Sequence, residues 1–201
     1  VVGMQLIFDF PLANVGSSMF EGLNSFALLA APLFILTGDL ISAGGIARRM
    51  SDFALAILGW LRGGLGMASL GACGMFAAIS GSNAATTATI GSITYPTMVK
   101  QGYDRNFSAA TAAAGGTVGI IIPPSILFIV YGYLISLPIS ELFLAGIIPG
   151  ILMVAVMMIA CYWVSRRRSY GQIIPFDWGI LRKTFPGASI GITAIFIVLG
   201  G

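Results

Sequence analysis

Residues 80–89 have the sequence Ser-Gly-Ser-Asn-Ala-Ala-Thr-Thr-Ala-Thr, a small and polar patch inside a long apolar stretch. The nearest charged residues are Arg62 on one side and Lys100 on the other. At membrane depth, hydroxyl and amide groups persist where they line a cavity or bind something, not where they face lipid. The patch is therefore the first candidate for a binding site.

The composition predicts an integral membrane protein in contact with a lipid bilayer. The 201 residues are 57% hydrophobic and 8% charged, whereas soluble domains are roughly a quarter charged. The net charge of +3 rests on few charges, so a nucleic-acid partner is not indicated. The absence of histidine removes the usual general base and a common metal ligand. Cys73 and Cys161 lie in apolar segments, and we expect them to be buried free thiols.

The stretch from 63 to 99 carries two apolar arms of roughly 16 residues each, one on either side of the patch. At about 1.5 Å per residue an arm reaches about 24 Å, which is short of the roughly 30 Å hydrocarbon core. A re-entrant helical hairpin with its tip at the patch fits these lengths better than two complete crossings. Both ends carry positive charge, which either arrangement would place on one side of the membrane.

The segment after the hairpin predicts a discontinuous helix. An Ala-rich helix is expected over 106–114, and a second helix to about 135. Gly115-Gly116-Thr117 interrupts the first, and Pro123-Pro124-Ser125 opens the second. Proline removes a backbone donor and clashes with the preceding turn, so one continuous helix is disfavoured.

The remaining segments complete a polytopic helical bundle. Residues 1–25 are expected to be a periplasmic or interfacial connection. Residues 26–62 should hold a span over 26–43 and an amphipathic interfacial helix over 46–61. Residues 63–135 hold the hairpin and the broken helix. Residues 136–201 should hold a turn to 141, a span over 142–164, a polar segment through Lys183 and a last span from Phe185.

Two features of this arrangement concern the chain as a whole. It places all ten basic residues on one side, which the positive-inside rule makes cytoplasmic. The last apolar run continues up to Gly201, and we expect the chain to be a piece of a longer protein.

The interrupted helices predict where binding occurs. A helix that stops inside the membrane exposes carbonyls at its end and N–H groups at the start of the next helix. Carbonyls suit a desolvated Na⁺, and a positive helix end suits a substrate carboxylate. The candidate ion- and substrate-binding residues are Ser80, Gly81, Ser82, Asn83, Thr86, Gly115, Gly116, Thr117, Pro123, Pro124 and Ser125. The candidate Na⁺ ligands among them are Ser80, Ser82, Asn83, Gly116 and Thr117, and no cofactor other than this ion is expected.

Packing is the alternative for several of these small residues. For Gly146 and Gly150, spaced as G-x-x-x-G, we favour helix packing. For Ser80–Asn83 we favour binding, because Gly or Ala alone would suffice for packing. Thr87 and Thr89 either bind or bond to carbonyls one turn earlier. Asp39 could be an ion or proton site, but we favour a carboxylate that reaches the interface or pairs with a nearby Arg.

Enzyme chemistry is not expected of this chain. No histidine can activate Ser80 or Ser82, and no lysine lies within a span. Asp39 has no second intramembrane acid with which to share a proton. The phosphate-binding motif G-x-x-x-x-G-K-[ST] is absent, so the chain is not expected to hydrolyse ATP.

Residues from about 20 to 201 resemble the large permease subunit of TRAP transporters, the tripartite ATP-independent periplasmic transporters. The strings that carry the likeness are PLFILTGDLISAGGIARRMSDFALAILGWLRGGLGM (32–67), FAAISGSNAATTATIGSITYPTM (76–98), AAAGGTVGIIIPPSILFIVYG (112–132) and LFLAGIIPGILM (142–153). The resemblance implies a Na⁺-coupled importer of small organic anions, of C4-dicarboxylate or sugar-acid type. It further implies a multi-pass protein of a bacterial or archaeal cytoplasmic membrane.

The same resemblance implies an architecture and partners. Such permeases are elevator transporters with two inverted repeats, of which this chain would hold the first. Residues 26–62 would lie on the scaffold side, and 63–135 would form half of the transport domain. A periplasmic binding protein would deliver the substrate, and a small four-helix membrane subunit would brace the permease. A scaffold or channel-like subunit that transports nothing by itself is the alternative.

Overall fold

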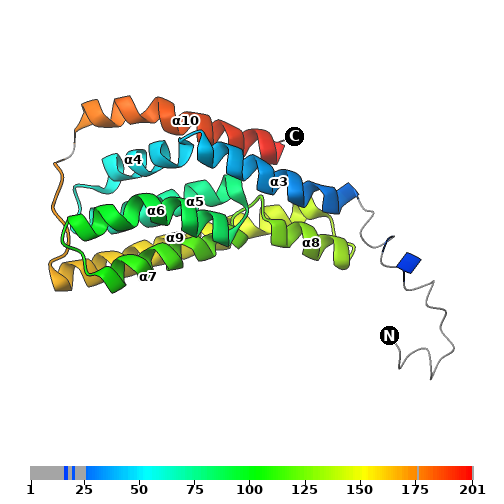
Figure 1. Ribbon diagram of the computed structural model, residues 1–201, viewed down its shortest axis with the longest axis horizontal. Helices are drawn as coiled ribbons and strands as arrows, with labels where there is room; N and C mark the ends of the chain where they lie inside the picture. Colours follow the sequence, from blue (N-terminus) through cyan, green and yellow to red (C-terminus); the bar gives the residue numbers. More distant parts are fainter. Residues whose placement is uncertain (1–15, 18–19, 21–25, 176, 201) are drawn as a thin grey trace, which may run out of the picture.

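The computed structural model describes residues 16–17, 20, 26–175 and 177–200. Across this part of the chain every regular element is a helix, which confirms the predicted all-α fold. Figure 1 shows the helices lying side by side along the long axis of the molecule. In chain order they are α3 (Phe26–Ala43), α4 (Ile46–Leu58), α5 (Gly64–Ser80), α6 (Asn83–Lys100), α7 (Arg105–Gly116), the 3₁₀ helix η1 (Thr117–Ile120), α8 (Ile126–Leu134), α9 (Ile139–Arg168) and α10 (Trp178–Gly200).

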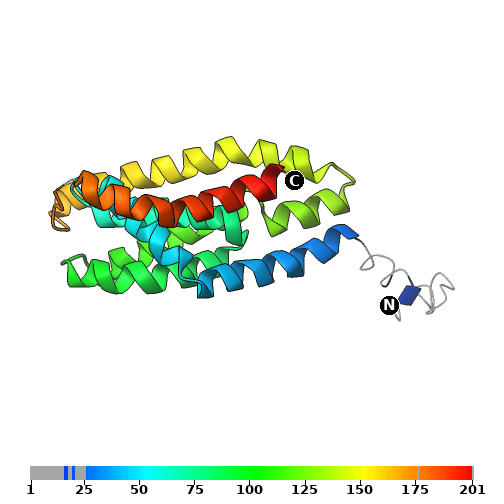
Figure 2. The same ribbon diagram turned by 90° about the horizontal axis from the view of Figure 1, so that it is seen from above.

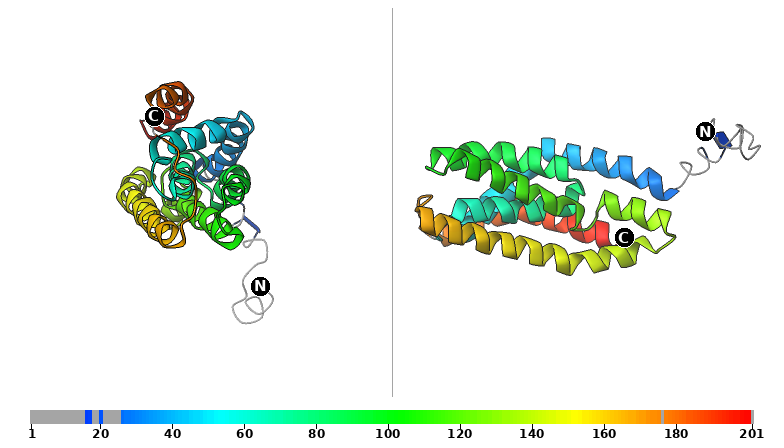
Figure 3. Two further views of the ribbon diagram at one scale, coloured as in Figure 1. Left: turned by 90° about the vertical axis from the view of Figure 1, so that its left-hand side faces the viewer. Right: turned by 90° about the horizontal axis from the view of Figure 1, so that it is seen from below.

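Helix α5 lies at the centre of the bundle, as the end-on view in Figure 3 indicates. All of its residues except Gly71 and Met75 are buried, and it packs against α4, α6, α7 and α9. Gly, Ala and Ser make up most of its sequence. Small side chains let neighbouring backbones approach closely, so α5 can be surrounded on every side. Its Cys73 and the Cys161 of α9 are buried free thiols, as predicted.

Helices α5 and α6 form a helical hairpin of 17 and 18 residues per arm. Midway along the pair, the Ser69 and Thr94 hydroxyl oxygens are 2.8 Å apart. Helix α3 keeps its predicted bounds and packs against α8 and both arms. Figure 2 shows α3 running beside α8. Helix α3 therefore lies beside both the hairpin and α8, the second half of the broken helix.

Helix α4 is amphipathic. Its buried residues Ala47, Met50, Ser51 and Ala54 recur at helical spacing and pack along α5. The helix ends at Leu58, three residues before the predicted end at 61. Its charged residues lie on the exposed side of the helix. Its position at the membrane interface remains a prediction.

The C-terminal part corrects two predicted boundaries. Helix α9 begins at Ile139, within the predicted turn, and includes the three arginines 166–168 at its end. Basic side chains at a helix C-terminus interact favourably with the helix dipole, so the helix continues through them. Helix α10 begins at Trp178, so it includes the end of the predicted polar segment through Lys183 as well as the predicted last span. The Asp177 carboxylate accepts from the Gly179 N–H (2.6 Å), the pattern of an N-cap that the sequence analysis overlooked.

The outer surface is apolar over long helical faces. Within the described residues, α9 is the one helix long and apolar enough to cross a membrane by itself, and α5 is a shorter apolar helix. Ile148 of α9 is 71% exposed and Leu40 of α3 is 65% exposed. Side chains of this kind are costly in water but suit contact with lipid or with another membrane helix.

Candidate functional site

The turn between α5 and α6 reverses the chain in two residues. Gly81 has a left-handed backbone (φ 59°), and its N–H donates to the Ala77 carbonyl (2.9 Å). Ser82 is extended and caps α6, because its hydroxyl accepts from the Ala85 N–H (3.4 Å). Glycine is the residue that adopts this left-handed turn without a steric penalty. The predicted tip, Ser80–Asn83, therefore coincides with the turn.

Two hydroxyls lie buried directly under the tip. The Ser80 and Thr86 side-chain oxygens are 2.8 Å apart, and both residues are almost fully buried. The Ser82 N–H also points at the Ser80 oxygen, at 3.5 Å. Each hydroxyl is the hydrogen-bond partner of the other across the start of α6, so the pair stabilises the turn as well as adding oxygen atoms near it.

The second interruption lies between α7 and α8. Helix α7 ends at Gly116 and is followed by one turn of the tighter 3₁₀ helix η1. Residues 121–125 are not helical, and α8 begins at Ile126. This segment includes the cis peptide bond between Pro123 and Pro124. The buried Ser125 hydroxyl donates to the Ile120 carbonyl (2.7 Å), which holds the two ends of the break together. A discontinuous helix is thus present where the sequence predicted one.

The tip and the break are in direct contact. The Ile126 N–H at the start of α8 donates to the Gly81 carbonyl (3.3 Å). A Cβ atom at Gly81 would lie 2.6 Å from the Pro124 carbonyl oxygen, and one at Gly119 would lie 2.6 Å from that of Ser82. Such distances are too short for real Cβ contacts, so glycine at both positions permits backbone to meet backbone.

Asn83 makes the most specific link between the two segments. In the orientation that satisfies every group, its amide nitrogen donates to the carbonyls of Gly116 (2.6 Å) and Thr117 (3.2 Å). Gly116 also lies against the Thr87 side chain, which leaves no room for a Cβ atom. One side chain of the hairpin therefore reaches the carbonyls at which α7 ends.

Not every candidate residue lies at this contact. The Thr117 hydroxyl is exposed and donates to the Ala114 carbonyl (2.6 Å), so Thr117 offers the tip its carbonyl alone. Gly115 packs instead against Cys73 of α5, whose sulfur would lie 2.6 Å from a Cβ atom. Pro123 is buried within the break.

Helix α3 contributes contacts that the sequence analysis did not assign to the site. A Cβ atom at Gly38 would lie 3.3 Å from the Ser80 Cα atom, so α3 crosses directly beside the tip. The Ser42 and Thr89 hydroxyl oxygens are 3.1 Å apart, which gives Thr89 a partner on another helix. Asp39 is exposed. The glycine before Asp39, in an otherwise apolar run, was the available signal for this close approach.

The opposite side of the break packs against α9. A Cβ atom at Gly150 would lie 2.6 Å from the Ile122 side chain, and one at Gly146 would lie 2.7 Å from the Ile121 carbonyl oxygen and overlap Phe128. The packing role predicted for this G-x-x-x-G pair is confirmed.

The chemistry of the contact is that of neutral oxygens and helix ends. Helices α5 and α7 end here with carbonyls, and α6 and α8 begin here with N–H groups. None of the candidate residues titrates, and within the described residues no cluster of three or more His, Cys, Asp or Glu could hold a metal ion. Neutral carbonyl and side-chain oxygens suit an alkali cation, and the positive ends of α6 and α8 suit an anion.

Comparison with known proteins gives a consistent result. Residues 2–201 match the family model of the DctM component of tripartite ATP-independent periplasmic transporters. The chain is 41% identical over 194 residues to the C4-dicarboxylate TRAP transporter large permease protein of Vibrio cholerae, covering 96% of this chain and 43% of the relative. It is 41% identical over 192 residues to the isethionate TRAP transporter permease protein of Oleidesulfovibrio alaskensis, covering 95% and 30%.

A third relative is the sialic acid TRAP transporter permease protein of Haemophilus influenzae, 35% identical over 204 residues, covering 100% of this chain and 33% of the relative. The chain thus spans between 30% and 43% of the length of these three relatives.

Proposed function

Because the chain belongs to the DctM component family of tripartite ATP-independent periplasmic transporters, we propose that it forms the hairpin-bearing part of a large permease that imports small organic anions. The named substrates of the three relatives are a C4-dicarboxylate, isethionate and sialic acid. All three are organic acids that are anionic at neutral pH. An organic anion is therefore the proposed substrate class, and C4-dicarboxylates and sugar acids are the first to test.

The coupling ion is proposed to be Na⁺, bound where the hairpin tip meets the broken helix. The observation that carries this proposal is the Asn83 amide, which faces the Gly116 and Thr117 carbonyls. If the amide turned by half a rotation, its oxygen would join those two carbonyls as a third hard ligand. Ser80 and Ser82, in the same turn, would supply further oxygens. An ion in this position would replace the N–H groups that now satisfy the carbonyls.

The substrate anion is proposed to bind next to this ion, at the N-termini of α6 and α8. The two helices begin at residues 83 and 126, and the N–H of residue 126 lies at the tip itself. Helix N-termini favour anions by about 0.3–1 kcal/mol each at exposed sites. An adjacent Na⁺ would add attraction for the anion, which gives a physical basis for coupling the two.

The hairpin is proposed to be re-entrant, with its tip inside the cytoplasmic membrane. Its arms of 17 and 18 residues are about 26 Å long, whereas α9 has 30 residues and is about 45 Å long. Only the second length exceeds a hydrocarbon core of about 30 Å with margin. An elevator movement of 63–135 against the scaffold would then carry the site across the membrane.

The complete transporter is proposed to include two partners. A periplasmic binding protein would deliver the anion, and a small four-helix membrane subunit would brace the permease. The exposed apolar faces of α3 and α9 are surfaces on which lipid or such a subunit could pack. A subunit that transports nothing by itself is the competing possibility.

The decisive experiment is Na⁺-driven uptake by the full-length permease and its partners in proteoliposomes. Asn83→Ala should raise the Na⁺ concentration for half-maximal uptake by about tenfold, since it removes one oxygen ligand of the ion and a loss of about 1.4 kcal/mol of binding free energy is tenfold in affinity. Asn106→Ala, at the far end of α7, is the matched control and should behave as wild type. An unchanged Na⁺ dependence in Asn83→Ala would rule out the proposed ion site, and absence of uptake in the wild type would favour the non-transporting alternative.

A further inference from the structure

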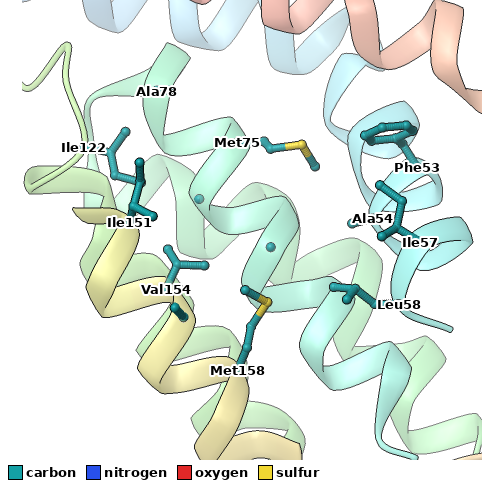
Figure 4. Close-up of a pocket in the computed structure, with 13 residues that line it drawn as sticks. Phe53, Ala54, Ile57, Leu58, Met75, Ala78, Ile122, Ile151, Val154 and Met158 are labelled. Atoms are coloured by element: carbon teal, nitrogen blue, oxygen red, sulfur yellow. The ribbon is translucent and has the colours of Figure 1, made fainter. Parts of the chain in front are cut away.

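An apolar groove lies between α4, α5 and α9 and extends to Ile122 of the break. It encloses about 460 Å³, and its lining side chains are all apolar. Figure 4 shows Ile122, Ile151 and Ala78 toward one end, and Leu58 and Met158 toward the other. Gly71 and Gly74 of α5 also line the groove.

The groove opens on the outer surface of the helical bundle. Ile57 at one lip is 39% exposed, and Ile151 at the other is 62% exposed. Residues of α9 farther along the same helix, such as Ile148, are exposed in the same way. In a membrane, the groove would open sideways to the acyl chains of the bilayer.

Basic and aromatic residues follow Leu58 and Met158, two residues that line the groove, along the chain. Arg62 lies four residues beyond Leu58, and Arg166 lies two helical turns beyond Met158. The two arginines flank a direct contact, because a Cβ atom at Gly63 would lie 2.6 Å from the Ser165 hydroxyl oxygen. Arg166 donates to the Tyr162 hydroxyl (3.5 Å).

These arginines are available to a ligand. Both are exposed, and within the described residues neither has a carboxylate within ion-pair distance. The exposed Trp60, two residues after the end of α4, and Trp163 of α9 lie close to them in sequence. Tryptophan and arginine at the end of a membrane helix are typical of the headgroup region.

We propose that this groove binds one acyl chain of an anionic phospholipid from the cytoplasmic leaflet, with its headgroup phosphate between Arg62 and Arg166. The orientation is that of a lipid, since the charged end of the groove lies at the predicted cytoplasmic side and the apolar end lies toward the middle of the membrane. The apolar lining and the volume of about 460 Å³ suit a lipid tail. A single chain of methylene groups fits such a slot.

The energetics indicate which end gives selectivity. A lipid tail is already in hydrocarbon, so entering the groove gains no hydrophobic free energy. It gains packing contacts with a lining that would otherwise lack neighbours. Discrimination between lipids must therefore come from the headgroup, where basic residues near the surface attract anionic lipid by about 1 kcal/mol each.

Photo-crosslinking of the full-length permease in nanodiscs tests the acyl-chain site. The probe is a phosphatidylglycerol that carries a diazirine at the middle of one acyl chain, in a phosphatidylcholine background. Residue-level mapping should find label on Met75 and Met158. Ala155→Leu, which fills the groove, should lose that label, whereas Ala113→Leu on the exposed face of α7 should keep it. Label confined to the outer face of α9 in the wild type would overturn the proposal and indicate that another segment of the permease fills the groove.

The headgroup site is tested separately, and without altering the groove. The measured quantity is the ratio of groove labelling by the phosphatidylglycerol probe to labelling by a phosphatidylcholine with the same tail. Arg62→Gln and Arg166→Gln should each lower this ratio by about fivefold. Lys100→Gln and Arg105→Gln, basic residues at the same end but on other helices, should leave it unchanged. An equal fall in both pairs would mean general surface attraction and would overturn the specific site.

Discussion

The break between α7 and α8 is held between two glycine-lined faces that differ in chemistry. On the side that faces the hairpin, Gly116 meets the Thr87 side chain and Gly119 meets the Ser82 carbonyl oxygen. On the α9 side, Gly146 and Gly150 meet mainly the apolar side chains of Phe128 and Ile122. Both pairs allow close approach, but only the first brings polar atoms together at the candidate site.

The difference shows that glycine spacing predicts that two segments lie close together, but not whether their contact binds a ligand or only packs. In each pair a missing side chain lets two segments touch, which is the ordinary use of small residues in membrane helices. The partner atoms decide what the contact can do. Carbonyls and an amide can exchange a hydrogen bond for an ion, whereas an aromatic ring and an isoleucine can only fill space.

The largest expected effect comes from closing the tip against the break. Gly81→Ala forces an L residue into a left-handed backbone, at about 1–2 kcal/mol, and sets a Cβ atom 2.6 Å from the Pro124 carbonyl oxygen. Such overpacking adds about 1–3 kcal/mol. We expect a large fall in the thermal unfolding midpoint of the permease and loss of Na⁺-driven uptake.

The matched control for Gly81→Ala is Gly102→Ala. Gly102 also has a positive φ, of 85°, but nothing lies within 4 Å of its Cβ position. Only the backbone cost should apply there, so its unfolding midpoint should fall less. Equal losses in the two variants would show that the contact with Pro124 contributes nothing.

Several elements of this region were predictable because their sequence signals are local. The hairpin followed from a charge-free stretch of 37 residues (63–99) with a polar centre, whose arm lengths can be compared with the thickness of a membrane. The break followed from paired glycines and paired prolines, which end helices for covalent reasons. These two features do not depend on what packs around them.

Other elements could not be predicted because they depend on three-dimensional packing. Nothing in the spacing of Asn83 and Gly116 requires that they meet. The approach of Gly38 to Ser80 likewise depends on how α3 crosses the hairpin. The start of α10 was missed for a different reason, since the Asp177 cap was a local signal within a segment dominated by its charges. Proximity of distant segments therefore had to come from the structure.

The second largest effect separates the two glycine faces. Gly119→Ala and Gly150→Ala each place a Cβ atom 2.6 Å from a neighbour, so each should destabilise the permease by about 1–3 kcal/mol. Their effects on function should differ. Gly119→Ala should raise the Na⁺ concentration for half-maximal uptake, because its neighbour is the Ser82 carbonyl. Gly150→Ala should reduce the amount of folded permease but leave that concentration unchanged, and a shift in both variants would contradict the assignment of the α9 face to packing.

A smaller effect tests the hydroxyl pair under the tip. Ser80→Ala leaves the fully buried Thr86 hydroxyl without its partner, at a cost of about 1–3 kcal/mol. The control is Ser69→Ala at the middle of the hairpin, where Thr94 still donates to the Ile90 carbonyl (2.9 Å). Thermal unfolding should show the larger loss for Ser80→Ala. Adding Thr86→Val should recover part of it, since replacing both partners by apolar groups is nearly neutral.

The smallest effect concerns α3, which touches the hairpin beside the break. The Ser42 and Thr89 hydroxyls form a partly buried hydrogen bond, and the net contribution of such a bond is about 0.5–1.5 kcal/mol. Ser42→Ala should therefore lower the unfolding midpoint slightly, and a double-mutant cycle with Thr89→Val should give a coupling of the same size. Thr37→Ala is the control, because the Thr37 hydroxyl donates to Leu33 of its own helix (2.7 Å) and should not couple to Thr89. Coupling for Ser42 and none for Thr37 would establish that this contact with α3 helps to hold the hairpin, whereas zero coupling for both would contradict that role.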